Sequence, residues 1–198
     1  MPNLAKRDPT LRTLVAHRDG DRVLVWQAHG VELADEVLAQ QTFGGPHWIG
    51  SRTTGLRLSL PALLERTAWG AGPGRERTLG VWIPATALDV YLHQGVLDER
   101  NDELYGSVRG HRLATRWAQV LVRWDDQVDL AGVATGRQTP RLGLRQEALR
   151  RFTEEDVLAV EDWTDTVRDG PDAVAARLPP STVIEVPEAT LQRLTGAM

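Results

Sequence analysis

Residues 23–29 read Val-Leu-Val-Trp-Gln-Ala-His, and this stretch decides the fold. Apolar side chains fill both alternating positions as far as Trp26, so we expect a strand that is buried on both faces. Residues 14–17 are also apolar, and the Asp19-Gly20 pair that follows them favours a tight type I′ turn. The two apolar runs therefore predict a β-hairpin whose second strand lies at the centre of a sheet.

The predicted central strand ends in polar side chains. Gln27 and His29 follow its apolar part, and Gly30 ends it before the helical apolar spacing of residues 31–41 begins. Polar groups at the end of a buried strand, just before a helix, lie where α/β-type folds commonly place ligands. A histidine there can also titrate near neutral pH. Gln27 and His29 are therefore candidate site residues, and the alternative for His29 is a hydrogen-bonded histidine at a turn.

The rest of the chain mixes short strands and helices without a regular order. Strands are predicted at residues 53–59, 78–83, 119–124, 141–144 and 157–160, and helices at residues 61–69, 85–93 and 146–152. Gly70–Gly74 lies between a helix and a strand, so it is predicted to be a linker. This pattern predicts an α+β domain with a central mixed, mostly antiparallel sheet flanked by short helices. We expect a main domain over residues 1–164 and a small C-terminal appendage over residues 165–198, packed on the main domain or on a second subunit.

Composition excludes several classes of protein. The chain has no cysteine, which excludes disulfide frameworks and thiolate metal sites, and its five histidines lack metal-ligand spacing, so no metal site is predicted. No apolar run approaches the roughly 18 residues of a membrane span. No apolar segment follows Lys6-Arg7, so we expect a cytoplasmic protein without a membrane partner. The net charge of -4 lacks the basic footprint of a general nucleic-acid binder.

A second group of candidate residues surrounds the strand predicted at residues 53–59. Arg52 and Arg57 flank or belong to this strand and are suited to bind an anionic group, and the alternative is a solvated arginine face. Ser59 precedes the next helix, where capping that helix is its ordinary role. Trp69 ends the same helix, where its ring could stack on a ligand.

Four blocks of sequence carry a resemblance to a known family. The first block is Val25–His29 with Leu33–Asp35, which match the family's V-Y-Q-A-Y and I-A-D. The second is residues 52–83, which align without gaps to its R-M-T-W-I-K-P-S block and to the R-S-G-W and G-Q-E-R segments after it. The third is Val122–Asp125, which matches its V-Q-W-D, and the fourth is residues 142–162, which match its I-G-L segment and closing strand. Over about residues 11–164, the chain therefore resembles the bacterial and fungal proteins grouped as domain of unknown function 4291.

The chain departs from this family in two of the blocks. Residues 55–58 replace the family's W-I-K-P, so Arg57 stands where the family has lysine. Residues 136–144 replace its P-H-R-S-I-Q-I-G-L, so Arg137 and Arg141 stand where it has histidine and glutamine. If either replaced residue carries chemistry in the relatives, this chain has changed that chemistry. We expect nothing in the family to match the C-terminal appendage.

The order of elements also resembles, more loosely, the compact ADP-ribosyltransferase-like fold. In that fold a residue on the first strand and a later Ser or Tyr hold NAD, and an acid orients the acceptor. The resemblance implies that Gln27 or His29 takes the first role, Ser59 the second and Glu76 the third. NAD is then the implied cofactor. Because the likeness is one of fold, it implies a hypothesis about function and no assignment.

Two classes of function follow from the sequence, and it leaves open whether the chain is catalytic. The first is a nucleotide-binding, NAD-dependent ADP-ribosyltransferase-like protein. Its cofactor-binding residues would be Arg52, Arg57, Ser59 and Trp69, and its catalytic residues Gln27, His29 and Glu76. The second is a non-catalytic RNA- or nucleotide-recognition module in which arginines contact phosphate and exposed tryptophans stack on bases. Its phosphate contacts would be Arg52, Arg57, Arg109, Arg112 and Arg116.

Overall fold

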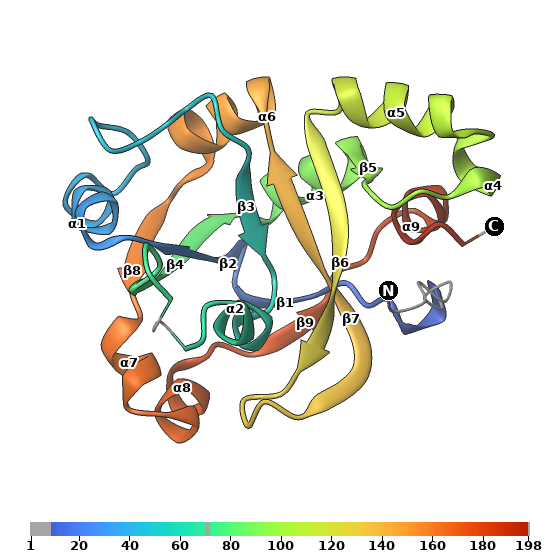
Figure 1. Cartoon of the computed structure of the whole chain (residues 1–198). Helices are drawn as coiled ribbons and strands as arrows, with labels where there is room; N and C mark the ends of the chain where they lie inside the picture. Colours follow the sequence, from blue (N-terminus) through green and yellow to red (C-terminus); the bar gives the residue numbers. More distant parts are fainter. Residues whose placement is uncertain (1–8, 70–71, 198) are drawn as a thin grey trace.

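The computed structural model describes residues 9–69 and 72–197 (Figure 1). The Lys6-Arg7 pair and the first two residues of the predicted Gly70–Gly74 linker lie outside the described residues. In the part of the chain that is described, no helix combines the length and the apolar character needed to cross a bilayer.

A curled, nine-stranded sheet forms the centre of the molecule. Its strands are β1 (Val15–Asp19), β2 (Arg22–His29), β3 (Thr54–Arg57), β4 (Arg77–Pro84), β5 (Gly95–Leu97), β6 (Val120–Val128), β7 (Ala134–Leu144), β8 (Ala159–Asp162) and β9 (Ser181–Val183). Neighbouring strands are antiparallel except β5 and β6, which run parallel. The predicted α+β domain with a mixed, mostly antiparallel sheet is confirmed.

β2 is the central strand, and its two edges differ. Along one edge it pairs with β4 over its whole length, from Arg22↔Pro84 to His29↔Arg77. The other edge is shared, because β1 pairs with the start of β2 and β3 pairs with it at Trp26↔Arg57. Beyond Trp26 the described chain places no strand on this edge of β2. The sheet therefore branches there, and the last residues of β2 border an opening.

Short helices cover both faces of the sheet (Figure 1). They are α1 (Val31–Gln40), α2 (Leu60–Arg66), α3 (Ala85–Gln94), α4 (Asp102–Tyr105), α5 (Val108–Trp117), α6 (Gln146–Arg151), α7 (Thr164–Arg168), α8 (Pro171–Arg177) and α9 (Glu188–Thr195), with a 3-10 turn at Pro9–Leu11 and a π-helical turn at Phe152–Asp156. Because side chains alternate along β2, Val23 and Val25 join the core under α1, α3 and α6, whereas Leu24 and Trp26 join a second core under α2, α7 and α8.

Two parts of the fold differ from the sequence-based expectation. No helix was predicted at residues 102–105, but Asn101 caps α4 there by accepting hydrogen bonds from the backbone N–H groups of Glu103 and Leu104. α5 follows, where no helix was predicted either, and none of its residues is buried. β7 begins at Ala134, well before the predicted residue 141, because it pairs with β6 as a long hairpin.

The segment after residue 164 completes the sheet. β9 pairs antiparallel with β1, from Val15↔Val183 to His17↔Ser181. At the other end of the segment, Leu194 is fully buried and its carbonyl accepts a hydrogen bond from Trp124 Nε1 at 2.8 Å. The residues expected to form an appendage thus supply both an edge strand and part of the main core.

Candidate functional site

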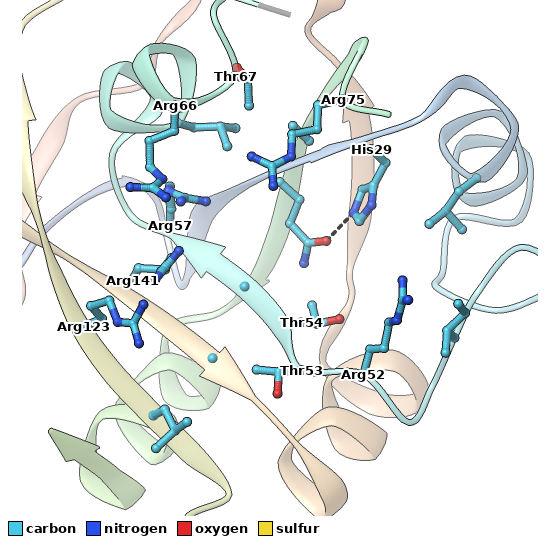
Figure 2. A pocket seen from close by; sticks show the side chains of 18 of the residues that line it. His29, Arg52, Thr53, Thr54, Arg57, Arg66, Thr67, Arg75, Arg123 and Arg141 are labelled. Carbon is cyan, nitrogen blue, oxygen red and sulfur yellow. Dashed lines mark hydrogen bonds between the residues drawn. The ribbon is translucent and has the colours of Figure 1, made fainter. Parts of the chain in front are cut away.

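A pocket of about 670 Å³ opens where β2 and β3 separate, and we call it the arginine pocket (Figure 2). Six arginines from three strands, one helix and two loops line it: Arg52, Arg57, Arg66, Arg75, Arg123 and Arg141. Asp98 is the carboxylate that lines it among the described residues. In a chain whose net charge is -4, this concentration of cations marks the pocket as a place for an anion.

Three of the arginines form a row across neighbouring strands. Arg57 on β3 lies opposite Arg141 on β7, and Arg141 lies opposite Arg123 on β6. Like charges directly opposite each other destabilise a sheet. The α2 side chain Arg66 approaches the same row, as Figure 2 shows. The row is therefore a strained arrangement that a bound anion would relieve.

The protein supplies few counterions for this row. Asp125 Oδ2 lies 3.4 Å from Arg57 Nε and 4.0 Å from Arg141 Nε, and neither Asp125 Oδ2 nor Arg57 Nε has a hydrogen-bond partner among the described residues. Asp98 forms an ion pair with Arg123. In the described chain, Arg66 forms no ion pair at all. The guanidinium groups thus outnumber the carboxylates that face them.

Burial and the neighbouring charges both act on the ionisation of Arg57. Burial lowers the pKa of Arg57 to about 10; Asp125 raises it, and the charges of Arg141 and Arg66 lower it. Burial likewise lowers the pKa of Arg141, and Arg123 and Arg66 lower it further. Both side chains stay protonated at neutral pH, so both keep their charge in a setting that disfavours it.

The opposite end of the pocket is aromatic and apolar. Leu33, Trp48 and Ile49 line it, and the rings of Trp48 and His29 lie 6.5 Å apart. In Figure 2, Arg57, Arg66, Arg123 and Arg141 gather on one side, whereas His29 and Arg52 lie on the other. The pocket therefore has a cationic end and an aromatic end.

Glycines form the floor between the two ends. Gly55 on β3 lies opposite Gly143 on β7, two residues along the strands from the Arg57–Arg141 pair, and both line the pocket. Because neither residue has a side chain, the sheet backbone is open to a ligand there. The side chains of Thr53 and Thr54 border the same region, as Figure 2 shows.

Gln27 and His29 form a hydrogen-bonded pair at the aromatic end. His29 Nε2 lies 2.6 Å from Gln27 Oε1. Burial lowers the pKa of His29 to about 4, so the ring is neutral at neutral pH. Gln27 is 2% exposed, and its Nε2 atom has no hydrogen-bond partner in the described structure.

The structure brings together four of the seven predicted site residues. Lining the arginine pocket are Gln27, His29, Arg52 and Arg57. The structure also places in the pocket five charged residues that the sequence analysis did not assign to the site: Arg66, Arg75, Asp98, Arg123 and Arg141. The sequence carried one signal for Arg123 and Arg141, since each is a lone charge beside buried apolar strand residues. Their convergence depends on strand pairing, which that signal does not contain.

The other three predicted residues do not line the pocket. Ser59 Oγ accepts a hydrogen bond from Ala62 N at 3.3 Å and so caps α2, and Ser59 borders a different groove. Trp69 lies after the end of α2 and is 37% exposed. Glu76 Oε1 accepts a hydrogen bond from Gly74 N at 2.6 Å. These three residues are therefore close to Arg57 in the sequence, but their side chains do not line the pocket.

The arrangement is suited to binding more clearly than to metal chemistry. Within the described residues, no group of three or more histidine, aspartate or glutamate side chains is placed to hold a metal ion. The cationic end offers guanidinium donors for phosphate oxygens, the glycine floor gives access to the backbone, and the aromatic end offers ring contacts.

Comparison with known proteins agrees with the resemblance seen in the sequence. No curated protein matches the chain. A family model described as Domain of unknown function (DUF4291) matches residues 13–190, a range that contains all six pocket arginines. It also contains most of residues 165–198, so the expectation that this segment has no counterpart in the family was wrong. By this match, the chain belongs to the family of the Domain of unknown function (DUF4291).

Proposed function

We propose that the arginine pocket binds a nucleotide, with the phosphate groups at the cationic end and the ring at the aromatic end. The observation that carries this proposal is the row of Arg57, Arg141 and Arg123 across three strands. Guanidinium groups donate paired hydrogen bonds to phosphate oxygens, and the phosphate charge would offset the repulsion within the row. A bound phosphate would thus give these guanidinium groups a charge-assisted partner beyond Asp125 and Asp98.

The size and the two-ended character of the pocket support a nucleotide over a simple anion. Its volume of about 670 Å³ falls within the usual range of ligand pockets, which is roughly 300–1,000 Å³. Inorganic phosphate would occupy only the cationic end. A nucleotide joins phosphates to a flat ring, which matches a pocket that has Arg57 and Arg141 at one end and Trp48 and His29 at the other.

For the reaction we propose NAD-dependent transfer of ADP-ribose. The bond between the nicotinamide nitrogen and ribose C1′ would break, neutral nicotinamide would leave, and the acceptor would bond to C1′ and release its proton to water. A carboxylate near C1′ would stabilise the developing positive charge. Glu76, the acid expected for this role, does not line the pocket, whereas Asp98 does. Phosphate bound to Arg123 would compete with the Arg123–Asp98 ion pair and free this carboxylate.

Calorimetric titration with inorganic triphosphate, ADP and NAD tests binding. We expect all three to bind and to raise the melting temperature, because a ligand specific for the folded state stabilises it. If none of them binds, the proposal is wrong. Chromatographic detection of nicotinamide released from NAD tests the reaction, with Asp98→Asn beside wild type. Binding of NAD without release of nicotinamide would support nucleotide binding and reject the proposed transfer of ADP-ribose.

α5 favours a second candidate function, recognition of RNA. The helix carries Arg109, Arg112 and Arg116 and no acidic residue, and Trp117 is 67% exposed. Cationic side chains beside an exposed aromatic ring are typical of surfaces that contact single-stranded nucleic acid. RNA binding would weaken steeply with salt, and Arg112→Gln would reduce that dependence. Binding of a nucleotide in the arginine pocket would be unaffected by this change.

A further inference from the structure

Gln27 Nε2 is a buried hydrogen-bond donor without a partner in the described structure. The side chain is 2% exposed and lines the arginine pocket. A buried donor that is left unpaired destabilises a protein, so nearly all such groups are paired in folded proteins. An unpaired donor in a pocket wall therefore indicates that the missing acceptor belongs to a ligand.

The branching of the sheet explains why the protein does not supply this acceptor. Gln27 lies opposite Leu79 on β4, and on its other edge the neighbouring strand β3 pairs with β2 at Trp26↔Arg57 and then diverges. The end of β2 thus faces the opening and not another strand. Gln27 lines the pocket at this point of the strand.

His29 adds an acceptor beside this donor. The neutral ring carries one N–H, and that N–H is directed from Nε2 to Gln27 Oε1. Nδ1 then carries a lone pair, and no hydrogen bond to it exists among the described residues. If the Gln27 amide were turned over and the proton moved to Nδ1, the pair would still offer one donor and one acceptor.

We propose that Gln27 and His29 bind the edge of the ligand ring, at a place where a hydrogen-bond acceptor of the ligand stands next to a donor. This inference rests on the proposed nucleotide function, since it assigns the aromatic end of the same pocket. The amidine edge of adenine has this pattern, because N1 is an acceptor and the neighbouring 6-amino group is a donor. Gln27 and His29 are then residues that select and position the ring, while the arginines hold the phosphates.

Three probes separate the two ends of the pocket by calorimetry. Inorganic triphosphate contacts only the cationic end, ATP adds an adenine edge, and purine riboside triphosphate adds a ring that lacks the 6-amino donor. For wild type we expect ATP to bind about tenfold more tightly than the purine analogue. Equal affinities for ATP and the purine analogue would overturn the assignment of Gln27 and His29, even if triphosphate binds as the proposed function requires.

A variant of Gln27 tests the assignment from the protein side. Gln27→Met keeps the length of the side chain and removes its donor, and Gln192→Met on the exposed face of α9 is the matched control. We expect Gln27→Met to weaken the binding of ATP about tenfold and to leave the binding of inorganic triphosphate unchanged. Because the variant also removes the Oε1 acceptor of His29, the melting temperature without ligand is recorded to separate stability from binding. Equal weakening of ATP and triphosphate would show a purely structural role and overturn the inference. Failure of wild type to bind any probe would reject the proposed function itself.

Discussion

Arg150 on α6 and Arg57 in the arginine pocket show two opposite ways of placing the same side chain. Arg150 is exposed and forms ion pairs with Glu147, Glu154 and Glu155 at 2.5–3.2 Å, and its hydrogen bonds to Glu147 and Glu154 raise its pKa. Arg57 is largely buried, has one carboxylate at 3.4 Å, and shares its surroundings with other arginines. Exposed ion pairs contribute little to stability. The comparison therefore teaches that a binding site is marked by a buried cation lacking its counterion.

The largest effect should follow from removing the one carboxylate that faces two pocket arginines. Asp125→Asn leaves Arg57 and Arg141 buried without it, and both partners of the Arg57–Asp125 pair have side chains only 11% exposed. Breaking a buried pair destabilises a protein by about 3–5 kcal/mol. We expect a loss of that size in urea unfolding and, at the same time, tighter binding of inorganic triphosphate. The exposed change Glu147→Gln is the control, and equal stability of the two variants would break the comparison.

Acid should destabilise the pocket through His29. Its pKa of about 4 in the folded chain lies below the ordinary value of 6.5, so the unfolded chain binds the proton first as the pH falls. The contribution of neutral His29 is complete above pH 6.5 and is lost progressively toward pH 4, by about 3 kcal/mol. Urea unfolding of wild type and His29→Gln across this range measures the difference.

The exposed histidine His47 gives the control for this pH effect. His47 Nδ1 lies 2.7 Å from Glu36 Oε1, so it already has a counterion. His47→Gln should keep the wild-type pH dependence, whereas His29→Gln should flatten it. A slope that is the same in wild type and His29→Gln would show that protonation of His29 is not resisted by the fold.

Arg57→Met should weaken the binding of triphosphate, and because it also breaks the Arg57–Asp125 pair, its affinity is measured at a temperature where urea unfolding shows the variant to be folded. One charge-assisted hydrogen bond contributes about 1.5–3 kcal/mol, so triphosphate should bind roughly ten- to a hundredfold more weakly. Arg150→Met removes a guanidinium that already has three carboxylate partners, and we expect it to leave triphosphate affinity unchanged. Calorimetry on the two variants sharpens the comparison directly. Equal losses would mean that the protein binds triphosphate by net charge alone.

The smallest expected effect concerns the floor of the pocket. A Cβ atom at Gly55 would meet Arg141 Cδ at 3.9 Å, which is ordinary van der Waals contact, so Gly55→Ala should fold normally. The added methyl group would hold a ligand away from the backbone, and we expect a loss of about 1 kcal/mol in nucleotide binding. Calorimetry with ADP and thermal melting of the free variant test both statements. An unchanged affinity would place the ligand away from this floor.

Local patterns predicted the centre of the fold and one end of the site. The apolar run over residues 23–26 was enough to predict β2 as a central strand, and the polar residues after it selected Gln27 and His29 at its end. The cationic row could not be predicted in the same way. Arg57, Arg123 and Arg141 come from distant parts of the sequence, and they meet only through the register of β3, β7 and β6.

Local signals also explain where the predicted site and the structure differ. Ser59 stands at the start of α2, and its hydroxyl serves the backbone of that helix. The capping pattern was visible in the sequence as the ordinary alternative for this residue. α5 was not predicted, although Leu113, Ala114 and Trp117 recur at helical spacing, and it buries none of its residues. Long-range pairing and exposed helices are thus the two features that local patterns did not reveal.

The pairing of β9 with β1 has a consequence for the nascent chain. Every residue that lines the arginine pocket lies between Gln27 and Gly143, and all of them are synthesised before residues 181–183. β1, although it is among the first strands synthesised, keeps a free edge until β9 arrives, and a free edge is where a chain pairs with the wrong neighbour. The risk of misassembly during translation is therefore concentrated at β1, and the pocket lies outside it.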